Sequence, residues 1–406
     1  MKNDNNKIGI LDRIPVYLVC VFILCFVIAI FLTEKKDFSE NENRKLAQMP
    51  KLTFENIKSG DFTSGVETFV ADQFPLRDTF LSLMTEVERI SLRKEIAGVF
   101  LAKDGSLIED YNNPRHTDKQ IQQFSKLSEN VENARCMIMM VPTAYSVYSE
   151  LLPDGAAKGD LQKQVIDEIY ASVPDKLQKI DASSKLKEEA EKIIGTENND
   201  KKDSLSPASS DTDTAGIDRL FYRTDHHWTT YGAYVGYEAF CEAAGLTAIP
   251  LSEYTGEVVS DSFKGTIYSK LNDPYFGSDS IVSYSHPDWK LSVKYEDSGE
   301  VTDTPYNPEY LTKKDQYSYF LNNIHPLITI TNDAVESGAI ALVKDSYANS
   351  MVPYLLQHYH TVYIFDTRYY KGGPSKFINE HPDITDVLIL YNMNTIDNDT
   401  GIGGIF

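Results

Sequence analysis

The sequence predicts an α/β protein with a mainly parallel sheet and, ahead of it, one apolar helix long enough to cross a membrane. Residues 136–141 form a continuous apolar run that ends at Pro142, as is typical of a strand buried on both faces. Strand patterns at 339–343, 361–365 and 386–390 alternate with helical patterns. This alternation is typical of parallel strands joined by helices that pack on the sheet.

The apolar run at residues 14–32 predicts a membrane anchor, because about 20 such residues are needed to cross a bilayer. Lys2, Lys7 and Arg13 precede the run, which indicates a cytoplasmic N-terminus and an extracytoplasmic bulk. No small-x-small cleavage site follows the run, so an uncleaved anchor is favoured over a signal peptide. We therefore expect a single-pass protein of the cell membrane, with a cytoplasmic stub and anchor at residues 1–33.

The net charge of the chain argues against one class of binding partner. The 406 residues carry a formal net charge of −21. A surface this acidic repels phosphate, which argues against nucleic acid as a partner held by charge. The chain is long enough to bury a substantial core beyond the anchor.

Residues 34–98 show amphipathic helical patterns that are interrupted near Pro75, which predicts a helical membrane-proximal segment. Residues 99–406 are expected to form the α/β domain. Its first elements are predicted as a hairpin at 99–109 and a helix at 117–134.

Two segments are expected to interrupt the α/β domain. Residues 196–216 contain almost no apolar side chains, which predicts a mobile loop. Residues 250–335 mix short β patterns with turns, which predicts a small β-rich insertion. Between them, a helix is expected at 230–244, closed by Gly245.

Ser346 follows the 339–343 strand pattern and opens a helical pattern that is expected to run to about His358. In parallel sheets the chemistry is found beyond the carboxyl ends of the strands. A serine at such a turn becomes a nucleophile when a base takes its proton, and the first amides of the helix can stabilise an oxyanion. The alternative is that Ser346 only caps the helix.

Asp225 and His227 are two residues apart, so on an extended turn both side chains point the same way and His226 points the other way. In serine enzymes a carboxylate orients the imidazole and stabilises its charged form. Two alternatives remain open. Asp225 caps the helix that starts near Thr230 while the histidines pack, or the Asp-His-His run supplies metal ligands. No further ligand cluster at suitable spacing is apparent, so we expect neither a metal nor a cofactor.

The run Asp225-His226-His227-Trp228 is the signature of the DHHW family of bacterial exported proteins, which the chain resembles. That family is similar to the periplasmic alginate O-acetylation proteins, which have an SGNH-hydrolase-like domain and a serine–histidine–aspartate triad. The resemblance extends over most of the chain past the anchor. It includes residues 42–44, 72–77, 103–105, 140–142, 263–266 and 345–347.

The resemblance implies a three-layer α/β/α fold of the SGNH type, with Ser346 as nucleophile, His227 as general base and Asp225 as its orienting partner. It also implies sugar or acyl binding near the cleft by Arg368 and Tyr369. The candidates for the oxyanion or for substrate binding are Tyr347, Asn323, Arg368, Tyr369 and Asn392.

Three functions follow as hypotheses. The first is transfer of an acyl group, with acetyl as the expected group, to a cell-surface or exported polysaccharide. The resemblance implies that a membrane-bound O-acyltransferase (MBOAT) partner supplies the acyl group. The second is a carbohydrate esterase with the same triad, in which water resolves the acyl-enzyme. The third is a non-catalytic polysaccharide-binding or scaffold protein of an export or modification complex.

Overall fold

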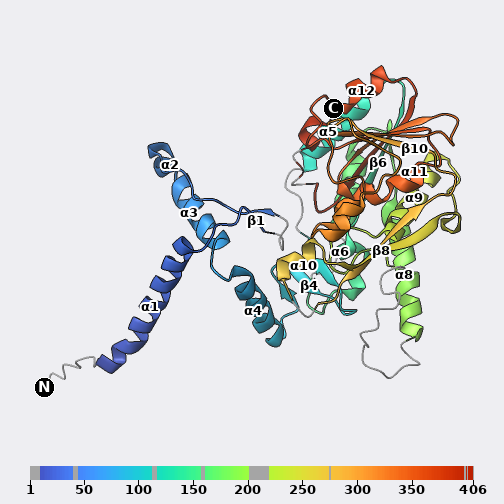
Figure 1. Ribbon diagram of the computed structural model, residues 1–406. Coiled ribbons are helices and arrows are strands. Elements are labelled where there is room, and N and C mark those ends of the chain that lie inside the picture. The colour runs from blue at the N-terminus through green and yellow to red at the C-terminus, as the bar shows by residue number, and fades with distance from the viewer. Residues whose placement is uncertain are drawn as a thin grey trace. The chain divides into compact units, whose positions relative to one another are not determined.

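The computed structural model describes residues 10–39, 44–111, 117–156, 161–200, 219–273, 276–396, 399 and 401–405. The chain forms two compact units (Figure 1). One comprises residues 1–92 with 271–274, and the other comprises residues 93–270 with 275–406.

The first unit begins with the long apolar helix α1 (Ile10–Leu32). Its Arg13–Leu32 stretch is long and apolar enough to cross a membrane, and by length and composition it equally suits an N-terminal signal sequence. The short strands β1 (Phe38–Ser39) and β2 (Arg44–Lys45) follow as an antiparallel pair. Residues 42 and 43 of the family-like segment 42–44 lie outside the described residues.

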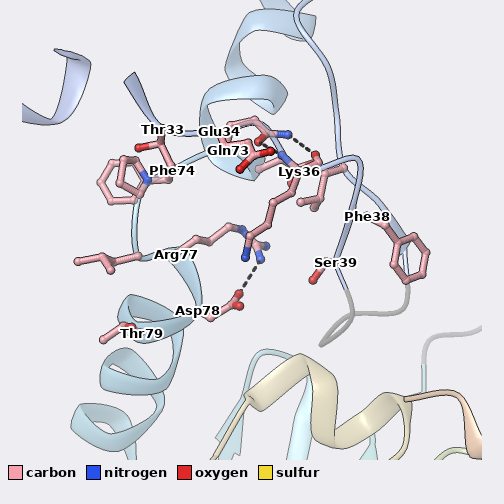
Figure 2. Close-up of a pocket in the computed structure, with 14 residues that line it drawn as sticks. Thr33, Glu34, Lys36, Phe38, Ser39, Gln73, Phe74, Arg77, Asp78 and Thr79 are labelled. Carbon is pink, nitrogen blue, oxygen red and sulfur yellow. Dashed lines mark hydrogen bonds and ion pairs between the residues drawn. The ribbon is translucent and has the colours of Figure 1, made fainter. Parts of the chain in front are cut away.

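Three helices complete this unit: α2 (Phe54–Ser59), α3 (Asp61–Asp72) and α4 (Arg77–Ile90). The chain turns sharply between α3 and α4, where Pro75 cannot continue a helix and Leu76 has a φ of 59°. Gln73 in this turn donates to the carbonyl oxygens of Lys36 and Ala47 over 2.8 and 3.1 Å. A pocket of about 510 Å³ is lined by residues 33, 34, 36, 38, 39, 46 and 72–79 (Figure 2).

The second unit is built on an eight-stranded sheet in the order β11-β10-β12-β14-β13-β15-β6-β7. Five neighbouring strands are parallel: β14 (Thr361–Phe365), β13 (Ala339–Lys344), β15 (Ile384–Asn392), β6 (Arg135–Val141) and β7 (Leu177–Lys179). All six residues of β13 are buried, as its continuous apolar run predicts. The mixed α/β fold with a mostly parallel sheet is therefore confirmed.

Smaller sheets and the helices surround this core. A three-stranded antiparallel sheet contains β3 (Glu95–Ile96) and the predicted hairpin, β4 (Val99–Leu101) and β5 (Leu107–Glu109). The strands β8 (Thr255–Phe263) and β9 (Asp279–Ser285) form an antiparallel pair. The helices are α5 (Thr117–Asn130), α6 (Ala144–Val147), α7 (Leu161–Ser172), α8 (Ala182–Asp200), α9 (Thr230–Ala244), α10 (Thr266–Leu271), α11 (Val352–Leu355) and α12 (Pro374–Glu380).

The segment 250–335, predicted to be a small β-rich insertion, contributes three strands to the main sheet besides the β8–β9 pair. These are β10 (Leu291–Tyr295), β11 (Val301–Thr302) and β12 (Leu327–Asn332), and β12 pairs with β14 in antiparallel fashion. Alternate residues of β10 are buried. A strand with one buried face reads the same in a sequence whether it joins the main sheet or a separate hairpin.

Two helical boundaries also differ from the prediction. Helix α8 continues to Asp200, into the segment expected to be a loop from residue 196, and residues 201–218 lie outside the described residues. The single helix expected from Ser346 to His358 is instead a 3₁₀ helix at Ser346–Ser350 followed by α11. Pro353 lies in the first turn of α11, because its ring excludes a continuous helix through that point.

Candidate active site

Ser346 lies just beyond the carboxyl end of β13, between the ends of β14 and β15. The cap of its 3₁₀ helix is Asp345, whose side chain accepts a hydrogen bond from the Tyr347 N–H over 2.9 Å. The hydroxyl of Ser346 therefore does not serve as the cap. Ser346 is partly exposed, whereas Asp345 and Tyr347 are buried, so the turn presents the serine to solvent.

Asp345 also ties this turn to the end of β15. Its Oδ2 accepts hydrogen bonds from the backbone N–H and the Nδ2 of Asn392, each 2.7 Å, and from the Thr395 hydroxyl over 2.8 Å. Burial raises the pKa of Asp345, although these donors oppose the shift. Four donors to one buried carboxyl group fix the backbone that carries Ser346.

The histidine loop runs from Leu220 to Thr229 and is closed at its base. The Thr229 N–H donates to the Leu220 carbonyl oxygen over 2.9 Å, and Phe221 and Trp228 form an isolated antiparallel bridge. The buried Trp228 indole donates to the carbonyl oxygen of Tyr347 over 2.7 Å. This bond joins the histidine loop directly to the turn that carries Ser346.

Asp225, His227 and Ser346 form a continuous hydrogen-bonded chain. Nδ1 of His227 lies 2.5 Å from Oδ1 of Asp225, and Nε2 of the same ring lies 2.8 Å from Oγ of Ser346. Asp225 and His227 are buried, at 3% and 5% exposure. The arrangement has the geometry of a nucleophile, a base and an orienting carboxylate.

The electrostatics of the pair suit a base that is neutral at pH 7. Burial alone raises the pKa of Asp225, but the charges of His226 and His227 and hydrogen bonds from His227 and Thr266 outweigh it and hold that pKa well below its ordinary value. Burial and the neighbouring charge of His226 lower the pKa of His227 to about 4, although Asp225 opposes the shift. A neutral imidazole beside a hydroxyl can accept its proton.

Two residues of the 263–266 segment, Gly265 and Thr266, constrain the Oδ2 side of the Asp225 carboxylate, whereas His227 uses Oδ1. The Thr266 N–H and hydroxyl donate to Oδ2 of Asp225 over 2.7 and 3.0 Å. A Cβ at Gly265 would lie 2.2 Å from Oδ2 of Asp225, so only glycine allows this close approach of backbone and carboxylate. Both oxygens of Asp225 are thus occupied, and the carboxylate has a single orientation.

Asp279 and Tyr317 support the loop from two other elements. The buried Asp279 carboxylate accepts hydrogen bonds from the Arg223 and Thr224 N–H groups over 3.0 and 2.8 Å and from the Thr224 hydroxyl over 2.5 Å. The Tyr317 ring stacks on His227 with ring centroids 3.7 Å apart and an interplanar angle of 11°. Its hydroxyl donates to the Ser346 carbonyl oxygen over 3.2 Å.

The expectation that His226 points away from His227 is wrong. The two ring centroids are 3.9 Å apart, and Nδ1 of His226 lies 2.6 Å from the Thr266 hydroxyl. The alternation of side chains holds only in extended backbone, and residues 223–227 form a series of bends.

Asp225, His226 and His227 each offer one atom that could bind a metal, and these atoms lie within 4.8 Å of one another. Both ring nitrogens of His227 are, however, engaged by Asp225 and Ser346, and Nδ1 of His226 is engaged by Thr266. The geometry therefore accommodates serine chemistry without rearrangement, whereas a metal bound by all three residues would require His227 to give up one of its two hydrogen bonds.

The remaining candidates lie at different places around the turn. The side chain of Asn392 bonds to Asp345 and Thr395, and the side chain of Asn323 accepts from Ser318. Neither amide side chain therefore bonds to Ser346. The Tyr347 amide is used by Asp345, and its hydroxyl donates to the carbonyl oxygen of His226.

Arg368 follows β14, at the same edge of the sheet as Ser346. Its guanidinium group bonds to Asp366 through Nε over 2.8 Å and through Nη2 over 2.5 Å. Lys344, buried at the end of β13, lies 3.8 Å from the same carboxylate. The neighbouring Tyr369 is 52% exposed and is available to a ligand.

The sequence patterns did not indicate Asp279 or Tyr317, because each lies far along the chain from the residues that it supports. Thr266 and Asp345 lie within the segments that carry the family resemblance. The sequence therefore marked both positions but indicated no role for either.

The DHHW protein family model matches residues 214–365, which include the whole Asp225–Trp228 run and Ser346. None of the curated proteins compared with the chain matches it. Among solved structures, the chain is similar to a DHHW family protein from Eubacterium siraeum, with 22% identity, a TM-score of 0.61, and coverage of 76% of this chain and 95% of that one.

The chain is also similar to Bacillus cereus PatB1, solved with a sulfonyl adduct (19% identity, TM-score 0.57, coverage of 75% of this chain and 97% of that one). A second PatB1 structure gives a TM-score of 0.56 at 19% identity, with coverage of 75% and 98%. At these identities the likeness is one of fold. Because the family model matches the segment that carries the motif, the predicted identification is confirmed: residues 214–365 are a DHHW-family region.

Proposed function

We propose that this chain is a membrane-anchored, extracytoplasmic serine enzyme that transfers an acyl group, acetyl in the simplest case, to a hydroxyl group of a cell-surface or exported polysaccharide. One observation carries the proposal. The imidazole of His227 hydrogen-bonds to the Ser346 hydroxyl 119 residues further along the chain while its other nitrogen bonds to Asp225. The proposal includes a three-layer α/β/α arrangement of the SGNH type for the second unit. It also includes α1 as a single-pass anchor, with the N-terminus in the cytoplasm.

Acylation starts when His227 accepts the Ser346 proton on Nε2 while Oγ attacks the carbonyl carbon of an acyl donor. Asp225 stabilises the imidazolium that forms. The tetrahedral intermediate collapses as His227 returns the proton to the leaving oxygen, which leaves an ester on Ser346. In this proposal the oxyanion is stabilised by the backbone N–H of Ser346, because the next amide is already used by Asp345.

Deacylation repeats these steps with a different nucleophile. His227 takes a proton from a sugar hydroxyl, whose oxygen attacks the ester carbonyl, and Ser346 regains its proton as the acylated sugar leaves. With water as the nucleophile the same site acts as an esterase. Because acetyl-CoA is absent outside the cytosol, a transferase needs an acyl donor delivered across the membrane, and a membrane-bound O-acyltransferase partner would supply it.

Two further observations support a reactive serine. Ser346 is the partly exposed residue of a turn whose neighbours are buried. PatB1, which has the same fold, is described with a sulfonyl adduct, and sulfonyl reagents attach to activated nucleophiles. The polysaccharide acceptor is inferred from the family resemblance, and the exposed Tyr369 at the same sheet edge provides a ring on which a sugar can stack.

The test is trapping of the acyl-enzyme. The full chain is incubated with an activated acetyl ester, and intact-protein mass spectrometry should find one added acetyl group, mapped to Ser346 by peptide analysis. Ser346→Ala should abolish it. Ser350→Ala is the matched control, because this serine lies in the same turn and bonds to Tyr317 rather than to His227. Equal acetylation of the Ser346→Ala and unmodified chains would exclude the proposed nucleophile.

Adding a polysaccharide acceptor then separates transfer from hydrolysis. Transfer predicts that the trapped acetyl group appears on the polysaccharide, whereas an esterase releases acetate at the same rate with or without acceptor. A chain that never acquires the acetyl group would support the non-catalytic alternative.

A further inference from the structure

Helix α4 has an apolar face that stays largely exposed among the described residues, although Phe80 at its start contacts the rings of Phe26 and Phe74. Phe80, Leu83, Met84, Val87 and Ile90 are between 42% and 77% exposed. Their spacing of three and four residues places them on one side of the helix, over about a third of its circumference. An exposed apolar stripe of this kind marks an interaction surface rather than ordinary solvent-facing positions.

The opposite face of α4 already has its partner within the first unit. Ser82 and Thr85 donate through their hydroxyls to the carbonyl oxygens of Asn272 and Leu271 over 2.9 and 2.7 Å. Arg89 forms an ion pair of 2.9 Å with the buried Asp273. These bonds fix the rotation of α4 about its axis and leave the apolar face directed outward.

The start of α4 contacts the apolar helix α1 close to the C-terminal end of α1. Phe26 of α1 stacks on Phe74, with ring centroids 4.9 Å apart, and meets Phe80 of α4 at 5.9 Å. Phe26 lies six residues before the end of α1 at Leu32, or about 9 Å along the helix. Amphipathic helices that lie on membranes bury their apolar face about 5–10 Å into the boundary between headgroups and acyl chains.

Polar groups mark the water side of this boundary. The pocket beyond the end of α1 is lined by Glu34, Lys36, Gln73 and Asp78, and Figure 2 shows Phe74 beside Thr33 with Arg77 pointing among these polar groups. Phe74 lines the same pocket, so apolar rings and charged groups meet at the end of α1, as at a membrane surface.

We propose that α4 lies in the outer surface of the membrane, with its apolar face in contact with lipid. The inference rests on the membrane anchoring that is part of the proposed function. The occupant is lipid rather than a second protein, because the face is continuous with α1 through Phe26 and Phe80. Binding is apolar rather than ionic, since α4 carries two basic residues against three acidic ones.

The test uses the full chain in phosphatidylcholine vesicles. The exposed Cys20 and Cys25 are replaced by alanine, whereas Cys136 and Cys241 stay because both are buried and burial raises their thiol pKa values to about 11. Met84→Cys then carries an environment-sensitive fluorophore. Val19→Cys reports the middle of α1, and Asp175→Cys reports a fully exposed position in the other unit.

A spin-labelled lipid should quench the probe at residue 84 severalfold more than the probe at residue 175. Iodide should quench the probe at residue 84 severalfold less than the probe at residue 175. High salt should change neither the lipid quenching nor the iodide quenching. Strong iodide quenching at residue 84 would overturn the proposal, and so would protection from both quenchers, which means a protein cover such as a second copy. Lipid quenching at residue 19 without quenching at 84 would remove this inference and leave the anchor intact. Absence of lipid quenching at 19 would remove both.

Discussion

The two sides of Ser346 are built in different ways. On the base side, one loop supplies Asp225 and His227 within three residues, and residues from other elements only support it. On the nucleophile side, the side chain of Asp345 at the end of β13 bonds to Asn392 and Thr395 and so connects this strand to the end of β15. Asp366 lies at the end of β14, beside Lys344 of β13. In the proposed mechanism the base side moves protons, whereas the nucleophile side keeps a backbone turn in place.

A buried carboxylate can support either a reaction or the backbone structure, depending on which groups it bonds to. Asp225 bonds to the imidazole of His227, which becomes charged in the proposed reaction and then needs the charge of the carboxylate. Asp345 bonds to three neutral amide donors and one hydroxyl. Substitutions on the two sides should therefore fail in different measurements.

The largest expected effect is on the base side. Asp225→Asn should slow acylation by on the order of 10⁴-fold, because the amide stabilises the wrong tautomer of His227 and cannot offset its charge. Stopped-flow kinetics with an activated acetyl ester would measure the rate. Asp315→Asn is the control, because Asp315 acts on His227 only through space. A rate within tenfold of the unmodified chain would show that Asp225 is not the orienting group.

On the nucleophile side, Asp345→Asn should reduce the free energy of unfolding by about 3 kcal/mol, because an amide donor would face buried donors of Asn392. Urea unfolding followed by circular dichroism would measure this loss. The exposed Asp154→Asn should leave the unfolding midpoint unchanged. If both variants are equally stable, the turn does not depend on this carboxylate.

A smaller effect is expected where the two sides meet at Tyr317. Tyr317→Leu removes the ring that stacks on His227 and should slow acylation about fivefold, in line with about 1 kcal/mol for an aromatic pair. Tyr317→Phe keeps the ring, loses the bond to the Ser346 carbonyl oxygen and should slow acylation less. Equal rates for the two variants would mean that stacking does not position the base.

The smallest effect concerns pH. Because burial holds the pKa of His227 at about 4, acylation should be constant above about pH 6 and fall only as the imidazole is protonated near pH 4. His226→Gln removes a neighbouring charge that lowers this pKa, so the acid limb should move to higher pH. A pH–rate profile of both chains would measure it, and a shift to lower pH would contradict the assigned cause.

Prediction from the sequence succeeded where the signal was local. The strands β6, β13, β14 and β15 were predicted from apolar runs because burial on both faces leaves few polar residues in a strand. It failed for β10 and β12, whose alternating residues do not reveal which sheet they join. It also failed for His226, because a series of bends removed the alternation on which the expectation depended.

The order of the parts can be read from the amino-acid sequence: an apolar N-terminal helix, a contiguous Asp225–Trp228 run, and a serine directly after a buried strand. These features depend on neighbouring residues, so they can be read along the chain. Only the tertiary structure decided that Tyr317 stacks on His227, that Asp279 holds the histidine loop and that Asp345 joins two strand ends. Such contacts join residues that are brought together by sheet order and loop closure, and no local pattern of side chains encodes either.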